Sequence, residues 1–182
     1  MNVFEFILIP CAIVVGLGIA ELFGGVVKIL RGELNAGRLH SVWVTCVFLQ
    51  QVQWLWSSWA LEDRGSWLFP EFLIFLIGPI GLYMAAAMLF PAENPGESLD
   101  LHLFERHRPF FLIMAVTLAS LSGASVLVVA GSVTGADVSR FSGVAMYGVL
   151  AVTRHRGVHW VCALAALGAQ LWFIYTFTFE VG

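Results

Sequence analysis

Residues 4–30 read FEFILIPCAIVVGLGIAELFGGVVKIL and carry charged side chains only at Glu5, Glu21 and Lys28. A helix needs about 20 mostly apolar residues to cross the hydrocarbon core of a bilayer. Because this stretch is longer than that and nearly free of charge, it predicts a membrane-spanning helix.

The rest of the chain has the same apolar character. Of its 182 residues, 59% are hydrophobic and only 12% are charged, against roughly 25% charged in soluble domains. We therefore expect an all-α, polytopic transmembrane helix bundle that forms one domain over residues 1–182. Six spans are predicted, at residues 4–30, 42–61, 67–90, 110–131, 133–153 and 158–179.

Two segments leave alternatives open. Arg140 interrupts the fifth predicted span, which needs residues 133–139 to reach across the membrane. Between the third and fourth spans, residues 99–108 (LDLHLFERHR) mix leucines with charges, which predicts a short helix lying in the membrane interface. An ordinary basic linker is the alternative for that segment.

The Lys and Arg side chains are divided unequally between the two sides of this arrangement. Of the nine in the chain, Arg64 and Arg140 fall on one side. The others fall on the opposite side: Lys28, Arg31, Arg38, Arg106, Arg108, Arg154 and Arg156. By the positive-inside rule, the connections between spans one and two, three and four, and five and six are then cytoplasmic, and both termini lie outside.

Glu21 is the acidic side chain placed deepest in a predicted span. An ionisable residue at that depth is costly, so it is a candidate functional residue. Beside it, Gly16, Ala20 and Gly24 recur every four residues, a spacing that lets two membrane helices approach closely. We expect span one to pack tightly against a neighbouring span or a second protomer.

A polar stripe in span two supplies a partner for this acid. Gln50 and Gln53 lie three residues apart on one helix face, and buried amides must find hydrogen-bond partners. If spans one and two form a hairpin, Glu21 and Gln50 lie at the same depth, and Gln170 of span six can join them. This polar centre is either a proton- or cation-handling site or a structural interhelical hydrogen bond.

Histidines offer a different chemistry on the cytoplasmic side. His155 and His159 have the one-turn spacing that can place two imidazoles on one metal, and His102 with Glu105 can add two ligands. The alternative is that this region contacts anionic lipid headgroups. The basic side chains concerned are Arg106, Arg108, Arg154 and Arg156.

Other motifs restrict the function classes. Pro79 in span three predicts a helix kink that either binds an ion or only bends a helix. The sequence has no nucleophile elbow, no phosphate-binding glycine loop and no zinc-protease motif. A net charge of −3 gives no basis for a nucleic-acid partner, and no cofactor is indicated.

Four segments resemble a family of small polytopic bacterial membrane proteins with no assigned activity. They are GLGIAELFGG (residues 16–25), QWLWSSW (53–59), SWLFPEF (66–72) and FERHRPFF (104–111). The resemblance covers roughly the first 115 residues and implies a location in the bacterial plasma (inner) membrane. It assigns no role to any residue.

These observations favour a small channel or transporter for protons, cations or a small solute, with Glu21 as the titrating group. Two other classes stay open: a non-catalytic membrane subunit, sensor or scaffold, and a metal-dependent membrane enzyme. The expected partners are the lipid bilayer and either further copies of the chain or a larger membrane complex.

Overall fold

The computed structural model describes residues 3–91, 98–124 and 135–177. In this part of the chain the fold is all-α, which confirms the expected fold class, and it contains no strand. The helices are α1 (Val3–Leu30), α2 (Arg38–Ser58), the 3-10 turn η1 (Trp59–Leu61), α3 (Phe69–Leu89), α4 (Leu99–Ala124), α5 (Gly135–Val152) and α6 (Arg156–Phe177).

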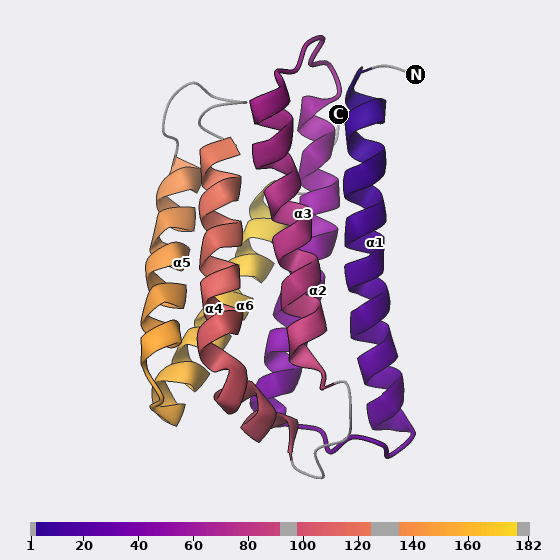
Figure 1. Cartoon of the computed structure of the whole chain (residues 1–182). Helices are drawn as coiled ribbons and strands as arrows, with labels where there is room; N and C mark the ends of the chain where they lie inside the picture. Colours follow the sequence, from indigo (N-terminus) through magenta and orange to yellow (C-terminus); the bar gives the residue numbers. More distant parts are fainter. Residues whose placement is uncertain (1–2, 92–97, 125–134, 178–182) are drawn as a thin grey trace.

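The long helices lie side by side in one bundle (Figure 1). α2 packs against α1, α3, α4 and α6, while α4 packs most extensively against α5 and α3. The α1–α2 and α5–α6 connections lie at one end of the bundle, and the α2–α3 connection lies at the other. α2 is therefore positioned to contribute to any site inside the bundle.

Three helices are long and apolar enough to cross a membrane: α1, α3 and the part of α6 from Arg156 to Thr176. A shorter apolar helix, Arg140–Val152, lies within α5. Their length and composition are compatible with an integral membrane protein. The prediction of six spans remains a prediction, because α2 carries several glutamines and α4 begins with the charged segment 99–108.

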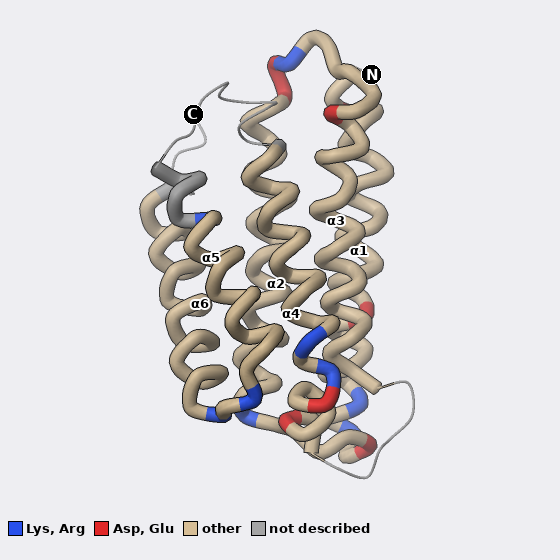
Figure 2. Tube along the Cα trace, turned by 60° about the vertical axis from the view of Figure 1, so that its left-hand side comes forward, with Lys and Arg blue, Asp and Glu red and all other residues tan. Residues whose placement is uncertain are grey.

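Charged side chains gather at one end of the bundle (Figure 2). Most of the Lys and Arg residues lie where α1 ends, where α2 and α4 begin, and where α5 meets α6. We call this the basic end. The predicted orientation of the chain in the membrane depends on this grouping of Lys and Arg. Its cytoplasmic location remains a prediction.

The segment 99–108 is helical, but it forms the beginning of α4 and not a separate helix. Its apolar residues Leu99 and Leu103 are buried in the bundle. The backbone N–H of Leu99 donates to the carbonyl oxygen of Asn35 at 2.9 Å, and Asp100 accepts from the backbone N–H of His40 at 2.8 Å. These contacts hold the segment on the α1–α2 connection.

The contact expected between Glu21 of the first helix and Gln50 of the second is not formed, because Glu21 is exposed. Gly18 faces Gln51, since a Cβ atom built on Gly18 would lie 2.6 Å from the Gln51 Nε2. Gly25 is covered by the ring of Phe90 at the end of α3. α1 packs more extensively against α3 than against α2, so the depth match between Glu21 and Gln50 does not produce a contact.

Glycines on α3 bring it close to its other neighbours. Gly78 faces the Trp54 indole, and Gly81 faces the Thr117 side chain of α4. Pro79 lies between them, is buried, and is contained in a helix that runs without interruption from Phe69 to Leu89. The glycines on either side of Pro79 thus make packing contacts, and an ion-binding role for Pro79 remains a prediction.

Four aromatic side chains fill the bundle between α2, α4 and α5. We call Trp43, Phe110, Phe111 and Tyr147 the inner aromatic cluster. The Trp43 ring centroid lies 5.0 Å from that of Phe111 and 6.0 Å from those of Phe110 and Tyr147. All four are buried, so the cluster is part of the packed core of the bundle.

Candidate functional site

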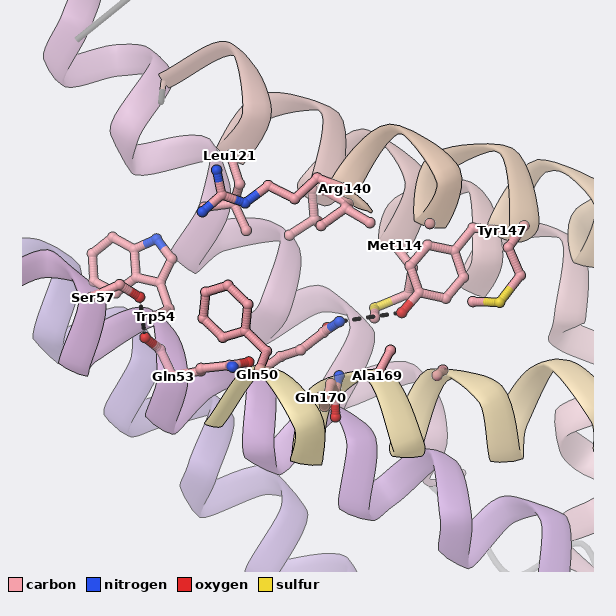
Figure 3. A pocket seen from close by; sticks show the side chains of 16 residues that line it. Gln50, Gln53, Trp54, Ser57, Met114, Leu121, Arg140, Tyr147, Ala169 and Gln170 are labelled. Carbon is pink, nitrogen blue, oxygen red and sulfur yellow. Dashed lines mark hydrogen bonds between the residues drawn. The ribbon is translucent and has the colours of Figure 1, made fainter. Parts of the chain in front are cut away.

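A cavity of about 190 Å³ lies between α2, α4, α5 and α6 (Figure 3). We call it the polar cavity. Each helix lines it with one face, at spacings of three, four or seven residues, as helical geometry requires. The α2 face consists of Gln50, Gln53, Trp54 and Ser57, so the amides of the predicted polar stripe do face the interior of the bundle.

Gln50 and Tyr147 line the end of the polar cavity that lies next to the inner aromatic cluster. The Gln50 amide Nε2 donates to the Tyr147 hydroxyl oxygen at 3.2 Å (Figure 3). Tyr147 is only 2% exposed and also belongs to the inner aromatic cluster. Tyr147 therefore belongs both to the lining of the polar cavity and to the inner aromatic cluster.

Gln170 is the amide whose hydrogen-bonding capacity is least satisfied. It lines the polar cavity from α6, it is 8% exposed, and neither its Nε2 nor its Oε1 has a hydrogen-bond partner. The Nε2 of Gln53 is likewise buried without a partner. A buried polar group left without a partner costs about 1–3 kcal/mol, so rotation of either amide toward the cavity lets an occupant satisfy it.

Arg140 is the charged side chain of the cavity wall. It extends from α5 along the wall toward Leu121 and the Trp54 indole (Figure 3). Among the described residues that line the cavity there is no Asp or Glu. The described lining therefore contributes one positive charge and no negative charge, and Arg140 itself is engaged in an interaction.

The inner aromatic cluster lies between the polar cavity and the basic end. Trp43 precedes Gln50 by two turns of α2, and Phe110 and Phe111 precede Met114 by about one turn of α4. Both helices begin at the basic end, so the cluster separates the cavity from it. Along α2 and α4, these rings therefore lie between an occupant of the cavity and the basic end.

Glu21 does not reach this site. It lies exposed on the outside of α1, and so do Gly16, Ala20 and Gly24. A Cβ atom built on Gly16 or Gly24 would meet nothing within 4 Å. The expected pairing of Glu21 with Gln50 is absent, and the small-residue stripe packs against none of the other described helices.

The histidines proposed as metal ligands are also separated. His159 is fully buried, with its Nε2 2.9 Å from the Thr153 carbonyl oxygen, whereas His155 is exposed. His102 places its Nε2 3.3 Å from the Met88 carbonyl oxygen. In residues 3–91, 98–124 and 135–177, no three His, Cys, Asp or Glu side chains are grouped to hold a metal ion.

The arginines assigned to lipid headgroups are all exposed at the basic end: Arg106, Arg108, Arg154 and Arg156. Arg156 also lies 5.4 Å over the Phe104 ring, a cation–π contact that orients its guanidinium. Headgroup binding by these side chains remains a prediction.

Sequence reasoning missed Arg140 and Tyr147 as members of the site. Both lie on α5, within the fifth predicted span (residues 133–153), which Arg140 interrupts. A signal was present, since Arg140, Gly143 and Tyr147 follow the three- and four-residue spacing of one helix face. This face of α5 carries two polar side chains and a glycine that leaves space beside them. Such a face in an otherwise apolar helix indicates a polar cavity.

The chain matches no protein-family model, no curated protein and no solved structure. The roles of these residues are therefore argued from their geometry alone.

Proposed function

We propose that this chain is an integral membrane protein that binds a small organic solute in the polar cavity and moves it across the bilayer. The observation that carries the proposal is Gln170, a buried amide in the cavity with no hydrogen-bond partner on either polar atom. A solute with one acceptor and one donor satisfies both atoms once this amide turns toward the cavity. Sites for drug-sized ligands have volumes of roughly 300–1,000 Å³, so this smaller cavity suits a metabolite-sized solute.

The proposed solute is neutral or anionic. Arg140 contributes a positive charge to the cavity wall, and the described lining residues contribute no carboxylate. The sequence favoured protons or cations because Glu21 was expected inside the bundle. Since Glu21 lies outside it, the described cavity wall offers a cation no carboxylate.

Transport is supported by the position of the inner aromatic cluster. A carrier exposes its site to one side of the membrane at a time, and the cluster separates the polar cavity from the basic end. We propose that six helices cross the membrane, that the basic end is cytoplasmic, and that both termini lie outside, as the charge distribution favours. The polar cavity then faces the outer side.

We expect Gln170→Leu to weaken binding of benzamide, a small planar probe with one carbonyl acceptor and one N–H donor group. Removing the amide eliminates both hydrogen bonds while keeping a side chain of similar size, so affinity falls about tenfold or more. The measurement is equilibrium dialysis of radiolabelled benzamide against the full chain in lipid nanodiscs. Glu21→Gln is the matched control and keeps native affinity; native affinity in Gln170→Leu contradicts the proposal.

Movement of the solute is tested by labelling a cysteine in the cavity. In a chain with Cys11, Cys46 and Cys162 replaced by alanine, Gln53→Cys is treated with a membrane-impermeant thiol reagent from each side of oriented proteoliposomes. Transport predicts labelling from both sides, because the cavity opens alternately. Labelling from one side only, with benzamide and without it, contradicts transport and leaves solute binding intact.

A second candidate, a subunit of a membrane assembly, is favoured by the outer face of α1. Gly16, Ala20 and Gly24 form an uncovered small-residue stripe there, and Glu21 lies next to it in a helix apolar enough to face lipid. A second membrane helix packed on the stripe covers the glycines and shields the carboxyl group from lipid.

We expect Gly24→Leu to dissociate such an assembly, because a large side chain prevents close approach of the helices. The measurement is the protein mass in mild detergent by light scattering. Gly148→Leu on α5, where an added Cβ also meets nothing within 4 Å, is the matched control and keeps the native mass. A native protein that is already a single protomer rules out self-assembly through this stripe.

A further inference from the structure

We infer that the basic end carries a binding site for one anionic phospholipid. Arg108 of α4 and Arg156 of α6 bind the phosphate, and the acyl chains lie on the exposed apolar faces of the same two helices. Neither arginine lines the polar cavity, so this site is separate from the one on which the proposed function depends.

Phe104 marks the place where the beginnings of α4 and α6 meet. Its ring centroid lies 4.9 Å from that of His159 on α6, and the Arg156 Cζ atom lies 5.4 Å from the same centroid. Arg108 follows Phe104 by four residues in α4, so the two side chains are neighbours on one face of that helix. Arg108 and Arg156 therefore both adjoin Phe104, although they come from different helices.

The positive charge of these two arginines is not neutralised by the described residues. Both side chains are exposed, and neither forms an ion pair with any residue in the described part of the chain. The carboxylate nearest to Arg108 in the sequence is Glu105, which is exposed on α4. Guanidinium groups offer N–H donors in a planar fork that fits the oxygens of a phosphate. Two of them at one place therefore suit a phosphate group.

Exposed apolar side chains continue from the arginines along both helices. Leu112 and Val116 follow Arg108 at four-residue spacing on α4, and Val161 and Leu164 follow on α6; all four are exposed. At about 1.5 Å per residue, they lie about 6–12 Å from the arginines along the helix axes. The headgroup region is about 5–8 Å thick on each side of a bilayer, so these side chains lie beside acyl chains when the arginines lie beside phosphates.

This apolar surface favours a lipid over a soluble phosphate compound. A soluble anion contacts the arginines alone, whereas a phospholipid also covers apolar surface on both helices, which adds to its affinity. Anionic lipids are attracted to basic side chains at the membrane surface. Charge and apolar surface together therefore point to one occupant, a phospholipid with a net negative headgroup.

The test compares three radiolabelled probes: phosphatidylglycerol, phosphatidylcholine with the same acyl chains, and glycerol phosphate, which has no chains. Binding is measured by scintillation proximity on the immobilised full chain in an uncharged detergent. Phosphatidylglycerol is expected to bind at least about tenfold more tightly than either other probe.

Two double variants locate the site. Arg108→Gln with Arg156→Gln is expected to remove the preference for phosphatidylglycerol over phosphatidylcholine. Arg31→Gln with Arg38→Gln is the matched control, because it removes two exposed arginines from the same end of the bundle, and it is expected to keep the preference. Arg156→Lys keeps the charge without the planar fork and is expected to retain only part of the preference.

Each other result overturns a stated part of this inference. Equal affinity for the two lipids overturns the anionic headgroup, and glycerol phosphate bound as tightly as phosphatidylglycerol overturns the lipid. An equal loss in both double variants overturns the assignment to Arg108 and Arg156, because only total charge then matters. If the first double variant fails to fold, the three probes on the native protein and the Arg156→Lys variant still decide. Benzamide binding in the polar cavity is a separate measurement, so either proposal can fail alone.

Discussion

Trp43→Ala is expected to lower the free energy of unfolding by about 3–5 kcal/mol, the usual cost of removing a buried tryptophan. Trp43 is fully buried, and its ring lies against those of Phe110, Phe111 and Tyr147. The substitution leaves a void that these rings cannot fill without moving. The measurement is unfolding by titration with sodium dodecyl sulfate, followed by circular dichroism.

Two matched variants make this prediction specific. Trp56→Ala removes the same side chain from the same helix at a position that is 49% exposed, and it is expected to change stability by less than about 1 kcal/mol. Trp43→Phe keeps an aromatic ring and removes an indole N–H that has no partner, so it should cost less than Trp43→Ala. Equal losses for Trp43→Ala and Trp56→Ala contradict the placement of Trp43.

The same substitution also affects the proposed transport. Because the inner aromatic cluster separates the polar cavity from the basic end, Trp43→Ala is expected to open a path between them. Gln53→Cys then becomes labelled from the basic side in most molecules, and faster than in the protein with Trp43 intact. Unchanged labelling means that the remaining rings close the bundle without Trp43.

Gly81→Ala is expected to destabilise the bundle by about 1–3 kcal/mol, the typical cost of overpacking a core. A Cβ atom at this position overlaps the Thr117 hydroxyl. That hydroxyl donates to the Ile113 carbonyl oxygen at 2.8 Å, so it cannot move aside without losing a hydrogen bond. α3 and α4 must therefore separate, and the loss is measured by the same detergent titration.

The control for Gly81→Ala is the same change where space is open. Gly148→Ala adds a methyl group that meets nothing within 4 Å, and we expect it to leave stability unchanged or slightly higher, since alanine favours helix. The double variant Gly81→Ala with Thr117→Ala should recover part of the loss, because the overlapping hydroxyl is gone. Full additivity of the two single effects contradicts a contact between these residues.

Much of the fold followed from local patterns. Apolar stretches separated by short polar segments predicted helices in the observed order, because helix formation depends on the length and composition of each stretch. The bounds were close except for α4, which begins at Leu99 and not at residue 110. The spacing of Gln50 and Gln53 placed both amides on one face of α2 for the same reason. Gln170 was expected to join them, and it lines the same cavity.

The errors arose where a prediction needed to know which helices touch. A hairpin of the first two helices was assumed, but α1 packs chiefly on α3. Gly25 meets Phe90 and Gly18 meets Gln51, so the opposite face of α1, with Glu21, turns outward. Spacing along one helix defines its faces, but it does not state which face meets which neighbour.

What the sequence by itself determined is the all-α class, the apolar helices, the basic end and the polar face of α2, since each depends on residues close together in the chain. Only the tertiary structure decided that Arg140 and Tyr147 join Gln50 and Gln170 around one cavity, and that Glu21 does not. The physical reason is that helices pack by fitting the side-chain ridges and small-residue gaps of several helices at once. That fit depends on residues as far apart as Gly25 and Phe90, or Gly81 and Thr117, and no local pattern contains it.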